Sequence, residues 1–280
     1  MKFSLLVIIY NERILETPTF LSLKMSLSRL HASRHQYNLI FWDNSPTEHQ
    51  QSDIGEVTSI FSALNVTTEY HHTPQNLPLS QIYNSVLDKV EESDDFLILF
   101  DQDSTFDVGY FNELESSTEL KRQPEIILPI IYYKNTVISP TKIFFIKGSY
   151  FDHEPIGYIS SEISAINSGM IISLAFIRRS GFRYNPKLRN YCTDDAIMKY
   201  ARDFSAVIYV MDYSFTHDLT LSTLNCNSEK LRTRYNEMVQ SKKIVFGKNI
   251  GVRVFLHVYY FAHRAYMCIK YKDLRYMKVK

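Results

Sequence analysis

The chain has 280 residues, of which 45% are hydrophobic, so it can bury a sizeable core as one large domain or as one domain with an appendage. Its three cysteines have no metal-type spacing and form no even set, which argues against a disulfide framework and favours the reducing cytoplasm. No apolar run is long enough to cross a membrane, which argues against an integral membrane protein. The net charge of +1 hides an asymmetry: residues 1–229 hold 18 Lys and Arg against 28 Asp and Glu, a net −10, whereas residues 230–280 hold 13 against 2, a net +11.

The first hundred residues predict strands that alternate with helices. We expect strands over residues 3–10, 37–42, 66–70 and 96–100, helices over 18–30, 54–64 and 79–90, and a loop over 71–76. The N-terminal apolar run is short, lacks a small-residue cleavage site and is followed at once by Asn11, Glu12 and Arg13, which favours a buried strand over a signal peptide. The alternation predicts a mostly parallel sheet with crossover helices.

The second half of the chain is less regular. We expect strands over residues 126–133, 142–146, 163–173 and 206–211, a loop over 148–159, and helices over 176–180 and 196–202. Thr193 and Asp194 are the candidate caps of the last of these helices. From residue 228 onward the pattern indicates long helices in which Lys and Arg alternate with aromatic and aliphatic residues.

Carboxylates follow the apolar strands of this predicted sheet. Asp101 and Asp103 come directly after the run 96–100, and Asp43 comes directly after the second strand. The carboxyl ends of parallel strands meet at one edge of the sheet, where ligands of open α/β sheets bind. Oxygen ligands of this kind suit Mg²⁺ or Mn²⁺. Each residue alone also has an ordinary explanation, as a turn residue or a helix cap.

Several short segments, in this order and spacing, resemble glycosyltransferase family 2. More narrowly, the chain resembles the bacterial rhamnosyltransferases and galactofuranosyltransferases that build surface polysaccharides such as O-antigen. The segments are Ile9-Tyr10-Asn11, Trp42-Asp43-Asn44-Ser45, Asn76, Asp101-Gln102-Asp103-Ser104, Asn167-Ser168-Gly169, Thr193-Asp194-Asp195 and Thr216-His217. The resemblance covers roughly residues 1–220.

The resemblance implies an α/β fold of the GT-A type with a Rossmann-like, mostly parallel sheet flanked by helices. Residues 1–228 would form the glycosyltransferase domain, with a nucleotide-sugar-binding half over 1–105 and an acceptor-binding half over 106–228. Residues 229–280 would form a basic, aromatic, helical tail. The implied reaction is metal-dependent, inverting transfer of a rhamnose-like or galactofuranose-like hexosyl group. It would run from a UDP- or dTDP-sugar to a hydroxyl of a growing, lipid-linked surface polysaccharide.

The resemblance also implies roles for single residues. Donor-binding residues would be Tyr10, Asn11, Asp43, Asn76, Asp101 and Gln102, and the acceptor side would include Ser168 and Gly169. Asp103 and His217 would hold Mg²⁺ or Mn²⁺. Asp195 would be the general base, with Asp194 as the alternative. Many relatives carry a second acid two positions after this pair and an arginine beyond it, whereas this chain has Ile197 and then Lys199 or Arg202, which leaves the assignment within the pair open.

The basic tail has two interpretations. It is an interfacial helix on an anionic membrane, which would make the protein peripheral at the inner face of the cell membrane, or it packs against the body with its basic face in solvent. A nucleic-acid-binding protein is a rival, but the acidic strand ends would repel nucleic acid, so we expect none to bind. A nucleotidyltransferase or another nucleotide-sugar enzyme would need a Gly-rich loop after the first strand, and none of the 8 glycines lies there.

Overall fold

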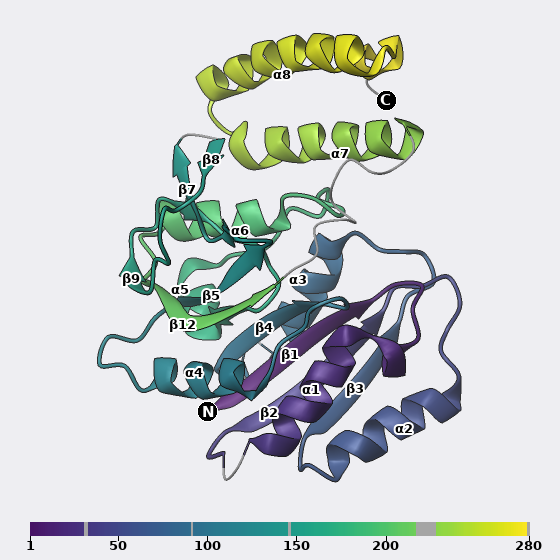
Figure 1. The fold of residues 1–280 in the computed structure, drawn as a ribbon, viewed down its shortest axis with the longest axis vertical. Helices are drawn as coiled ribbons and strands as arrows, with labels where there is room; N and C mark the ends of the chain where they lie inside the picture. The colour runs from purple at the N-terminus through teal and green to yellow at the C-terminus, as the bar shows by residue number, and fades with distance from the viewer. Residues whose placement is uncertain (31–32, 91, 145–146, 217–227, 279–280) are drawn as a thin grey trace.

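Strands and helices alternate over the first hundred residues of the computed structural model, which describes residues 1–278 except 31–32, 91, 145–146 and 217–227 (Figure 1). In chain order these elements are β1 (Lys2–Ile9), α1 (Pro18–Arg29), β2 (Gln36–Asp43), α2 (Gln51–Ser62), β3 (Thr67–His72), α3 (Leu79–Val90) and β4 (Phe96–Asp101). The four strands pair in parallel in the order β3-β2-β1-β4. The alternation is as predicted, although β3 runs through His72, two residues into the predicted loop.

The second half extends this sheet and adds a smaller one. Its elements are α4 (Val108–Thr118), β5 (Ile126–Tyr133), β6 (Thr136–Ser139), β7 (Thr141–Phe144), β8 (Lys147–Ser149), β9 (Gly157–Ile159), β10 (Ile163–Ser164), β11 (Met170–Ser173), α5 (Leu174–Ser180), α6 (Thr193–Asp203) and β12 (Ile208–Thr216). The large sheet continues in the order β4-β11-β5-β12-β9, with β11 antiparallel to both of its neighbours and β5 parallel to β12. The expected α/β class with a mostly parallel central sheet is confirmed.

Three local predictions for the second half were wrong. The strand predicted over 163–173 is interrupted, because Gly169 has a φ of 75°, a left-handed conformation that turns the chain out of a strand. The loop predicted over 148–159 contains the end of β8 and all of β9. The cap of α6 is Cys192, so Thr193 and Asp194 lie inside the first turn of the helix.

Both faces of the large sheet are covered by helices. On one face, α1, α2 and α4 bury Phe20, Phe61 and Phe111 against β1 and its neighbours. On the other face, α3, α5 and α6 bury side chains such as Ile82 and Ile197. Because β1 and β4 are buried on both faces, the sequence of each is a nearly continuous apolar run rather than an alternating one.

Two antiparallel helices, α7 (Ser228–Phe246) and α8 (Ile250–Tyr271), stack on the second half of the chain, and α8 forms the outermost layer (Figure 1). A cluster that includes Cys192, Val239, Leu256 and Tyr260 joins the body to α7 and α7 to α8. The short 3₁₀ helix η3 (Leu274–Met277) returns toward α8. The basic tail therefore packs on the body through α7.

Candidate active site

Acidic side chains gather at one edge of the parallel strands. The strand registers align Asp43 with Ile9 on one side and His72 on the other, and align Asp101 with Ile8. The carboxyl ends of β1, β2, β3 and β4 therefore lie level with one another. The convergence expected from the sequence is present at this edge, called the acidic rim here for Asp43, Asp101 and Asp103.

Asp43 is fully buried and both of its carboxylate oxygens accept hydrogen bonds. Oδ2 accepts from the Tyr70 hydroxyl at 2.7 Å, and Oδ1 accepts from the backbone N–H of Ser45 at 2.9 Å. Burial and the charge of Asp43 raise the pKa of Tyr70, so its hydroxyl stays protonated and remains a donor. His49 Nε2 lies 3.7 Å from Oδ2 and has no hydrogen-bond partner among the described residues. Asp43 thus fixes the turn after β2.

Hydrogen bonds join the turn after β1 to the turns after β4 and β2, and the turn after β3 to the turn after β2. Tyr10 donates its backbone N–H to Gln102 Oε1 at 2.6 Å, and Gln102 Nε2 donates to the Tyr10 carbonyl at 3.3 Å, which ties β1 to β4. Asn11 donates its backbone N–H to Ser45 Oγ at 2.8 Å. Asn76 Oδ1 accepts from Asn44 Nδ2 at 3.0 Å. Tyr10 itself is exposed and available to a ligand.

Asp103 carries an unpartnered oxygen in the turn after β4. Its Oδ1 is buried and has no hydrogen-bond partner among the described residues. The turn is held by Thr19, whose hydroxyl donates to the Asp101 carbonyl at 2.5 Å, and by Ser104, whose hydroxyl donates to the same carbonyl at 3.1 Å. A buried carboxylate oxygen without a donor is costly unless a cation or a ligand completes it.

The turn of Asn167, Ser168 and Gly169 connects the acidic rim to the start of α6. The Ser168 hydroxyl contacts the Ser104 hydroxyl, and Gly169 donates its backbone N–H to the Leu99 carbonyl at 2.7 Å. Asn167 Nδ2 donates to the Thr193 hydroxyl at 2.9 Å. A Cβ at Gly169 would lie 2.9 Å from Pro129 Cγ, so a side chain at this position would clash with Pro129.

Asp194 and Asp195 open α6 opposite the rim. The helix N-terminus favours negative charge at this place. Burial, and next the charge of Asp195, raise the pKa of Asp194 to about 7, and the charge of Asp101 acts in the same direction. Asp195 Oδ2 accepts from Lys242 Nζ of α7 at 2.7 Å. Burial alone would lower the pKa of Lys242, but the charge of Asp195 raises it, so the pair is an ammonium and a carboxylate.

Sequence reasoning missed Lys242 and Tyr83. Lys242 is one of 13 Lys and Arg residues in a region that we expected to lie outside the site, and nothing local distinguishes it. Tyr83 is a buried residue of α3 whose pKa is raised by burial and next by the charge of Asp101, with Asp194 acting in the same direction, so it lies near both acidic groups. In the sequence, Tyr83 is one more aromatic residue on the apolar side of a helix, so nothing there predicts that it lies near the acidic groups.

Asp194→Asn should change how stability depends on pH. The ordinary pKa of 3.8 is raised to about 7 in the folded protein, so the folded state keeps a proton that the unfolded chain releases between these values. The free energy of unfolding of the wild type should therefore fall as pH rises through this window, by at most about 1.4 kcal/mol per pH unit. Urea unfolding of both proteins at about pH 5 and about pH 8 measures this, using Asp212→Asn, an exposed acid, as the control. An identical pH dependence of wild type and Asp194→Asn would contradict the raised pKa of Asp194.

The residues at the rim suit a divalent cation. The unpartnered Oδ1 of Asp103 is a hard oxygen donor, and Asp101 lies two positions before it at the end of β4. Within the described part of the chain, no three His, Cys, Asp or Glu side chains lie close enough to form a metal site. His217, the further ligand implied by the resemblance, lies outside the described residues. A cation here would need ligands beyond these two carboxylates, such as donor phosphates.

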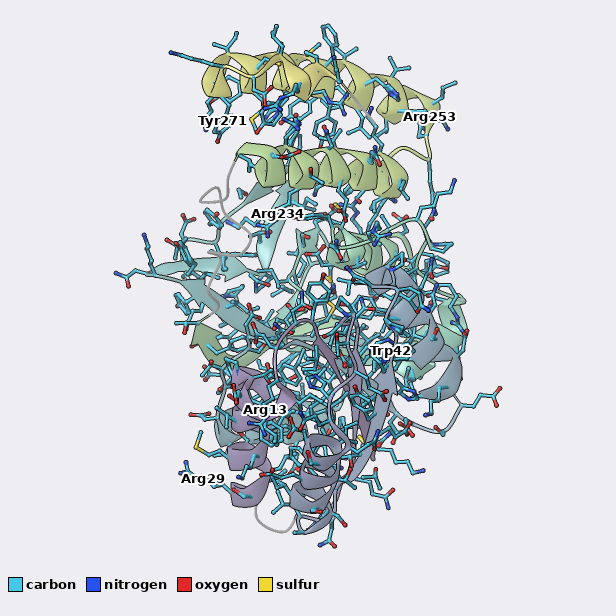
Figure 2. All side chains as sticks on the ribbon, turned by 90° about the vertical axis from the view of Figure 1, so that its right-hand side faces the viewer. Arg13, Arg29, Trp42, Arg234, Arg253 and Tyr271 are labelled. Atoms are coloured by element: carbon cyan, nitrogen blue, oxygen red, sulfur yellow. The ribbon has the colours of Figure 1, made fainter. Side chains whose placement is uncertain are left out.

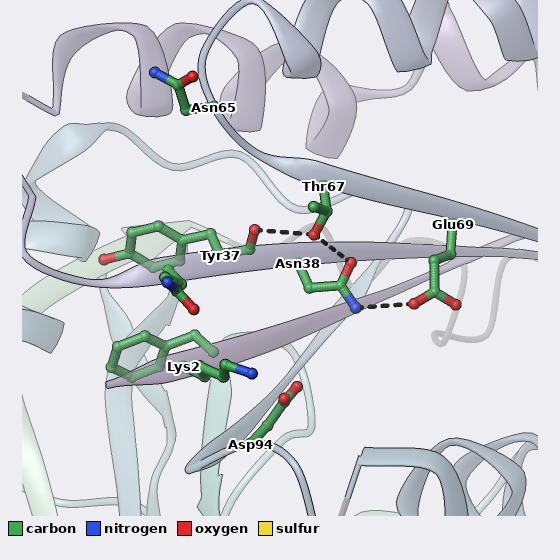
Figure 3. A pocket seen from close by; sticks show the side chains of 9 residues that line it. Lys2, Tyr37, Asn38, Asn65, Thr67, Glu69 and Asp94 are labelled. Atoms are coloured by element: carbon green, nitrogen blue, oxygen red, sulfur yellow. Dashed lines mark hydrogen bonds between the residues drawn. The ribbon is translucent and has the colours of Figure 1, made fainter.

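A separate hollow of about 510 Å³ lies at the opposite, amino-terminal edge of the strands (Figure 3). Its polar side chains bond to one another: Asn38 Nδ2 donates to Glu69 Oε1 at 3.1 Å, and the Thr67 hydroxyl donates to Asn38 Oδ1 at 2.9 Å. Ligands of open α/β sheets bind at the carboxyl ends of the strands. The acidic rim, rather than this hollow, is therefore the candidate active site.

Comparisons with known proteins identify the fold. The sequence matches no protein-family model and no curated protein. Among solved structures, residues 1–349 of S. aureus TarS in complex with UDP-GlcNAc match with a TM-score of 0.53 at 13% identity, over 94% of this chain and 73% of that one. The chain has a GT-A-type fold.

Two further structures show the same GT-A arrangement. GalNAc-T7 with UDP, GalNAc and Mn²⁺ matches with a TM-score of 0.59 at 12% identity, over 98% of this chain and 58% of that one. The mannosyltransferase PcManGT from Pyrobaculum calidifontis, in complex with GDP-Man and Mn²⁺, matches with a TM-score of 0.57 at 11% identity, over 93% and 69%. The predicted fold type is confirmed. No helix within the described residues is both long and apolar enough to span a bilayer.

Proposed function

We propose that the protein is a divalent-metal-dependent glycosyltransferase that moves a sugar from a nucleotide-sugar donor to an acceptor hydroxyl. The observation that carries this proposal is two acidic groups in a GT-A-type fold that interact electrostatically. Asp101 ends β4 and Asp103 follows it by two residues, and Asp194 and Asp195 lie in the first turn of α6. Asp101 contributes to the raised pKa of Asp194, so the two groups are close enough to interact electrostatically. The carboxylates after β4 could bind a cation that contacts the donor's phosphates. The carboxylates of α6 could remove a proton from the acceptor hydroxyl.

The donor half of the proposed site is the edge formed by β1 and β2. Asp43, Tyr10 and Asn11 surround the turn at which a nucleotide would bind, and Asn76 lies beside it through Asn44. Gln102 is already bonded to the Tyr10 backbone in both directions, so its role is to hold this edge in place. When bound, a Mg²⁺ or Mn²⁺ ion at Asp101 and Asp103 would neutralise negative charge that develops on the diphosphate.

The proposed reaction is a single displacement. The acceptor oxygen forms a bond to the anomeric carbon, the bond from that carbon to the phosphate oxygen breaks, and the nucleoside diphosphate leaves with the electron pair. The acceptor proton passes to a carboxylate of α6. Attack on the side opposite the leaving group inverts the configuration at the anomeric carbon.

We assign the base to Asp195 and a supporting role to Asp194. A base must be ionised, and Asp195 is paired with the ammonium of Lys242, whereas the pKa of Asp194, raised to about 7, leaves that carboxyl only partly ionised near neutral pH. Lys242 holds Oδ2 of Asp195, and Oδ1 accepts a longer hydrogen bond from the Ser164 hydroxyl at 3.3 Å. Oδ1 is therefore the atom available to an acceptor hydroxyl. We propose that Ser168 and Gly169 belong to the acceptor side, since the neighbouring Asn167 bonds to Thr193 at the start of α6.

Our proposal for the particular substrates rests on the resemblance to glycosyltransferase family 2. We propose a UDP- or dTDP-activated rhamnose-like or galactofuranose-like hexose as donor and a lipid-linked surface polysaccharide as acceptor, at the cytoplasmic face of the cell membrane. We propose the same division for the site: residues 1–105 would supply the donor edge, and residues 106–228 would supply the acceptor edge together with Lys242 of α7. The neighbouring structures contain UDP, UDP-GlcNAc or GDP-Man, so GDP-sugars belong in the same test.

A donor screen tests the proposal. The full chain, incubated with UDP-, dTDP- and GDP-sugars and Mn²⁺ or Mg²⁺, should release nucleoside diphosphate with at least one donor, and chelation with EDTA should abolish the release. Isothermal titration calorimetry with UDP, dTDP and GDP adds a readout that needs no acceptor. Binding of a nucleoside diphosphate should require the divalent ion. If no nucleotide binds or is released in the presence of metal, the chain is not a nucleotide-sugar enzyme.

A further inference from the structure

The outermost helix, α8, presents a wide apolar face to solvent. Ile250, Val254, Val258, Phe261, Tyr266 and Ile269 are between 54% and 79% exposed. At 100° per residue these positions fall within one half of the helix circumference, and no charged residue of α8 lies within that half. Contiguous exposed apolar surface of this kind marks an interaction site rather than ordinary surface composition.

The opposite face of α8 is occupied by packing within the chain. Leu256, Tyr260 and Met267 are buried in the cluster that joins α8 to α7. Figure 2 shows side chains of α8 that project away from the body, with Arg253 near one end of the helix and Tyr271 near the other. The apolar half is therefore not needed for the fold and remains uncovered by the described residues.

Positive charge borders the apolar face. Arg253 and Lys270 lie outside the apolar half of α8, and Lys272 follows its last turn. The helix contains no acidic residue, and residues 230–280 carry a net +11. The nearest acid in sequence, Asp273, already accepts from Arg232 at 3.0 Å and from Arg275 at 2.9 Å. Apolar side chains bordered by basic ones are typical of helices that lie in the interface of an anionic membrane.

We propose that the exposed apolar face of α8 docks on an anionic lipid surface. The charge decides between lipid and the main alternative, a second copy of the chain, because two copies joined through α8 would bring two strongly positive surfaces together. Phe261, Val258 and Ile269 would enter the acyl boundary while the basic side chains contact lipid phosphates. With 22 residues at about 1.5 Å each, α8 offers an apolar strip about 33 Å long that lies along the surface.

This orientation would also direct the acceptor side of the site toward the lipid. An apolar groove of about 310 Å³ lies between α7 and α8, and Tyr266 and Lys270 line both the groove and the edge of the exposed face. Tyr191, which lines the same groove, precedes the first turn of α6 by two residues. Vesicle attachment does not require sugar transfer, so the two proposals fail separately.

Vesicle sedimentation of the full chain tests the docking face. The wild type should bind phosphatidylcholine vesicles that contain phosphatidylglycerol far better than phosphatidylcholine alone, and high salt should release part of it. The double variant Phe261→Ser/Ile269→Ser removes two exposed side chains and should lower the partition coefficient at least about tenfold. The matched control is Leu21→Ser/Met25→Ser, which removes two exposed apolar side chains from α1 and should bind as the wild type does.

Three outcomes would overturn the proposal. They are equal binding by Phe261→Ser/Ile269→Ser and the wild type, no preference of the wild type for anionic vesicles, and a loss of binding in the α1 control as large as in the α8 variant. Light scattering of the vesicle-free proteins adds a further test. A wild-type dimer that the α8 variant converts to a monomer would make this face an interface between copies. Circular dichroism confirms that each variant is folded.

Discussion

Asp195→Asn is expected to reduce sugar transfer by about 10²–10⁴-fold while leaving nucleotide binding nearly unchanged. The amide keeps the size of the carboxylate but cannot accept the acceptor's proton. In the proposed site the donor would bind at the acidic rim, which the Asn167–Gly169 turn separates from the start of α6, so its affinity should not depend on this charge. Initial rates and calorimetric titration with the nucleoside diphosphate measure the two effects separately.

The ion pair with Lys242 requires its own control. Asp195→Asn leaves the Lys242 ammonium in a largely buried place without its carboxylate, which costs stability for reasons unrelated to catalysis. The double variant Asp195→Asn/Lys242→Met should recover that stability but not the activity. Lys242→Met alone should reduce kcat less than Asp195→Asn does. If Asp194→Asn loses transfer and Asp195→Asn keeps it, the roles within the pair are reversed.

Asp103→Ala is expected to abolish metal-dependent nucleotide binding and to lower transfer by about 10²–10³-fold. The estimate follows because metal stabilisation of the leaving charge contributes several kcal/mol, and each 1.36 kcal/mol is a factor of ten in rate. The variant removes the buried, unpartnered Oδ1, so the folded protein should be no less stable than the wild type. Titration of Mn²⁺ in the presence of UDP measures the binding, and urea unfolding measures the stability.

Asp212→Asn is the matched control for this variant, since Asp212 is an exposed acid of β12 and lies outside the proposed site. It should retain Mn²⁺ affinity and transfer. Normal Mn²⁺ binding by Asp103→Ala would show that the cation is held elsewhere, and its Oδ1 would then need another explanation.

The donor edge could be predicted from sequence because its signals are local. Apolar runs such as 96–100 end in carboxylates, and the register of parallel strands then brings Asp43 and Asp101 to one edge without further information. Thr17 before Pro18 predicts the start of α1, and its hydroxyl accepts from the Phe20 backbone N–H as expected of a cap.

The acceptor edge depends on contacts between segments far apart in the chain. The break in the strand predicted over 163–173 arises because Gly169 bonds to Leu99, Asn167 to Thr193 and Ser168 to Ser104, and none of these pairs is visible in a window of sequence. Lys242 reaches Asp195 across 47 positions. The net charge of the tail can be counted from the sequence. Only the tertiary structure shows that Lys242, among its lysines, contacts Asp195.

The bridge between Lys242 and Asp195 limits how the protein can be divided for engineering. A fragment that ends before α7 lacks Lys242, whose ammonium holds Asp195. It also exposes the apolar surface around Cys192 that α7 and α8 cover. Chimaeric enzymes should therefore exchange α6 and α7 together, so that the carboxylate at the position of Asp195 keeps the lysine that pairs with it. Separate expression of the two pieces should restore more activity when the piece that holds α7 and α8 carries Lys242 than when it carries Lys242→Met, so complementation would report on this bridge.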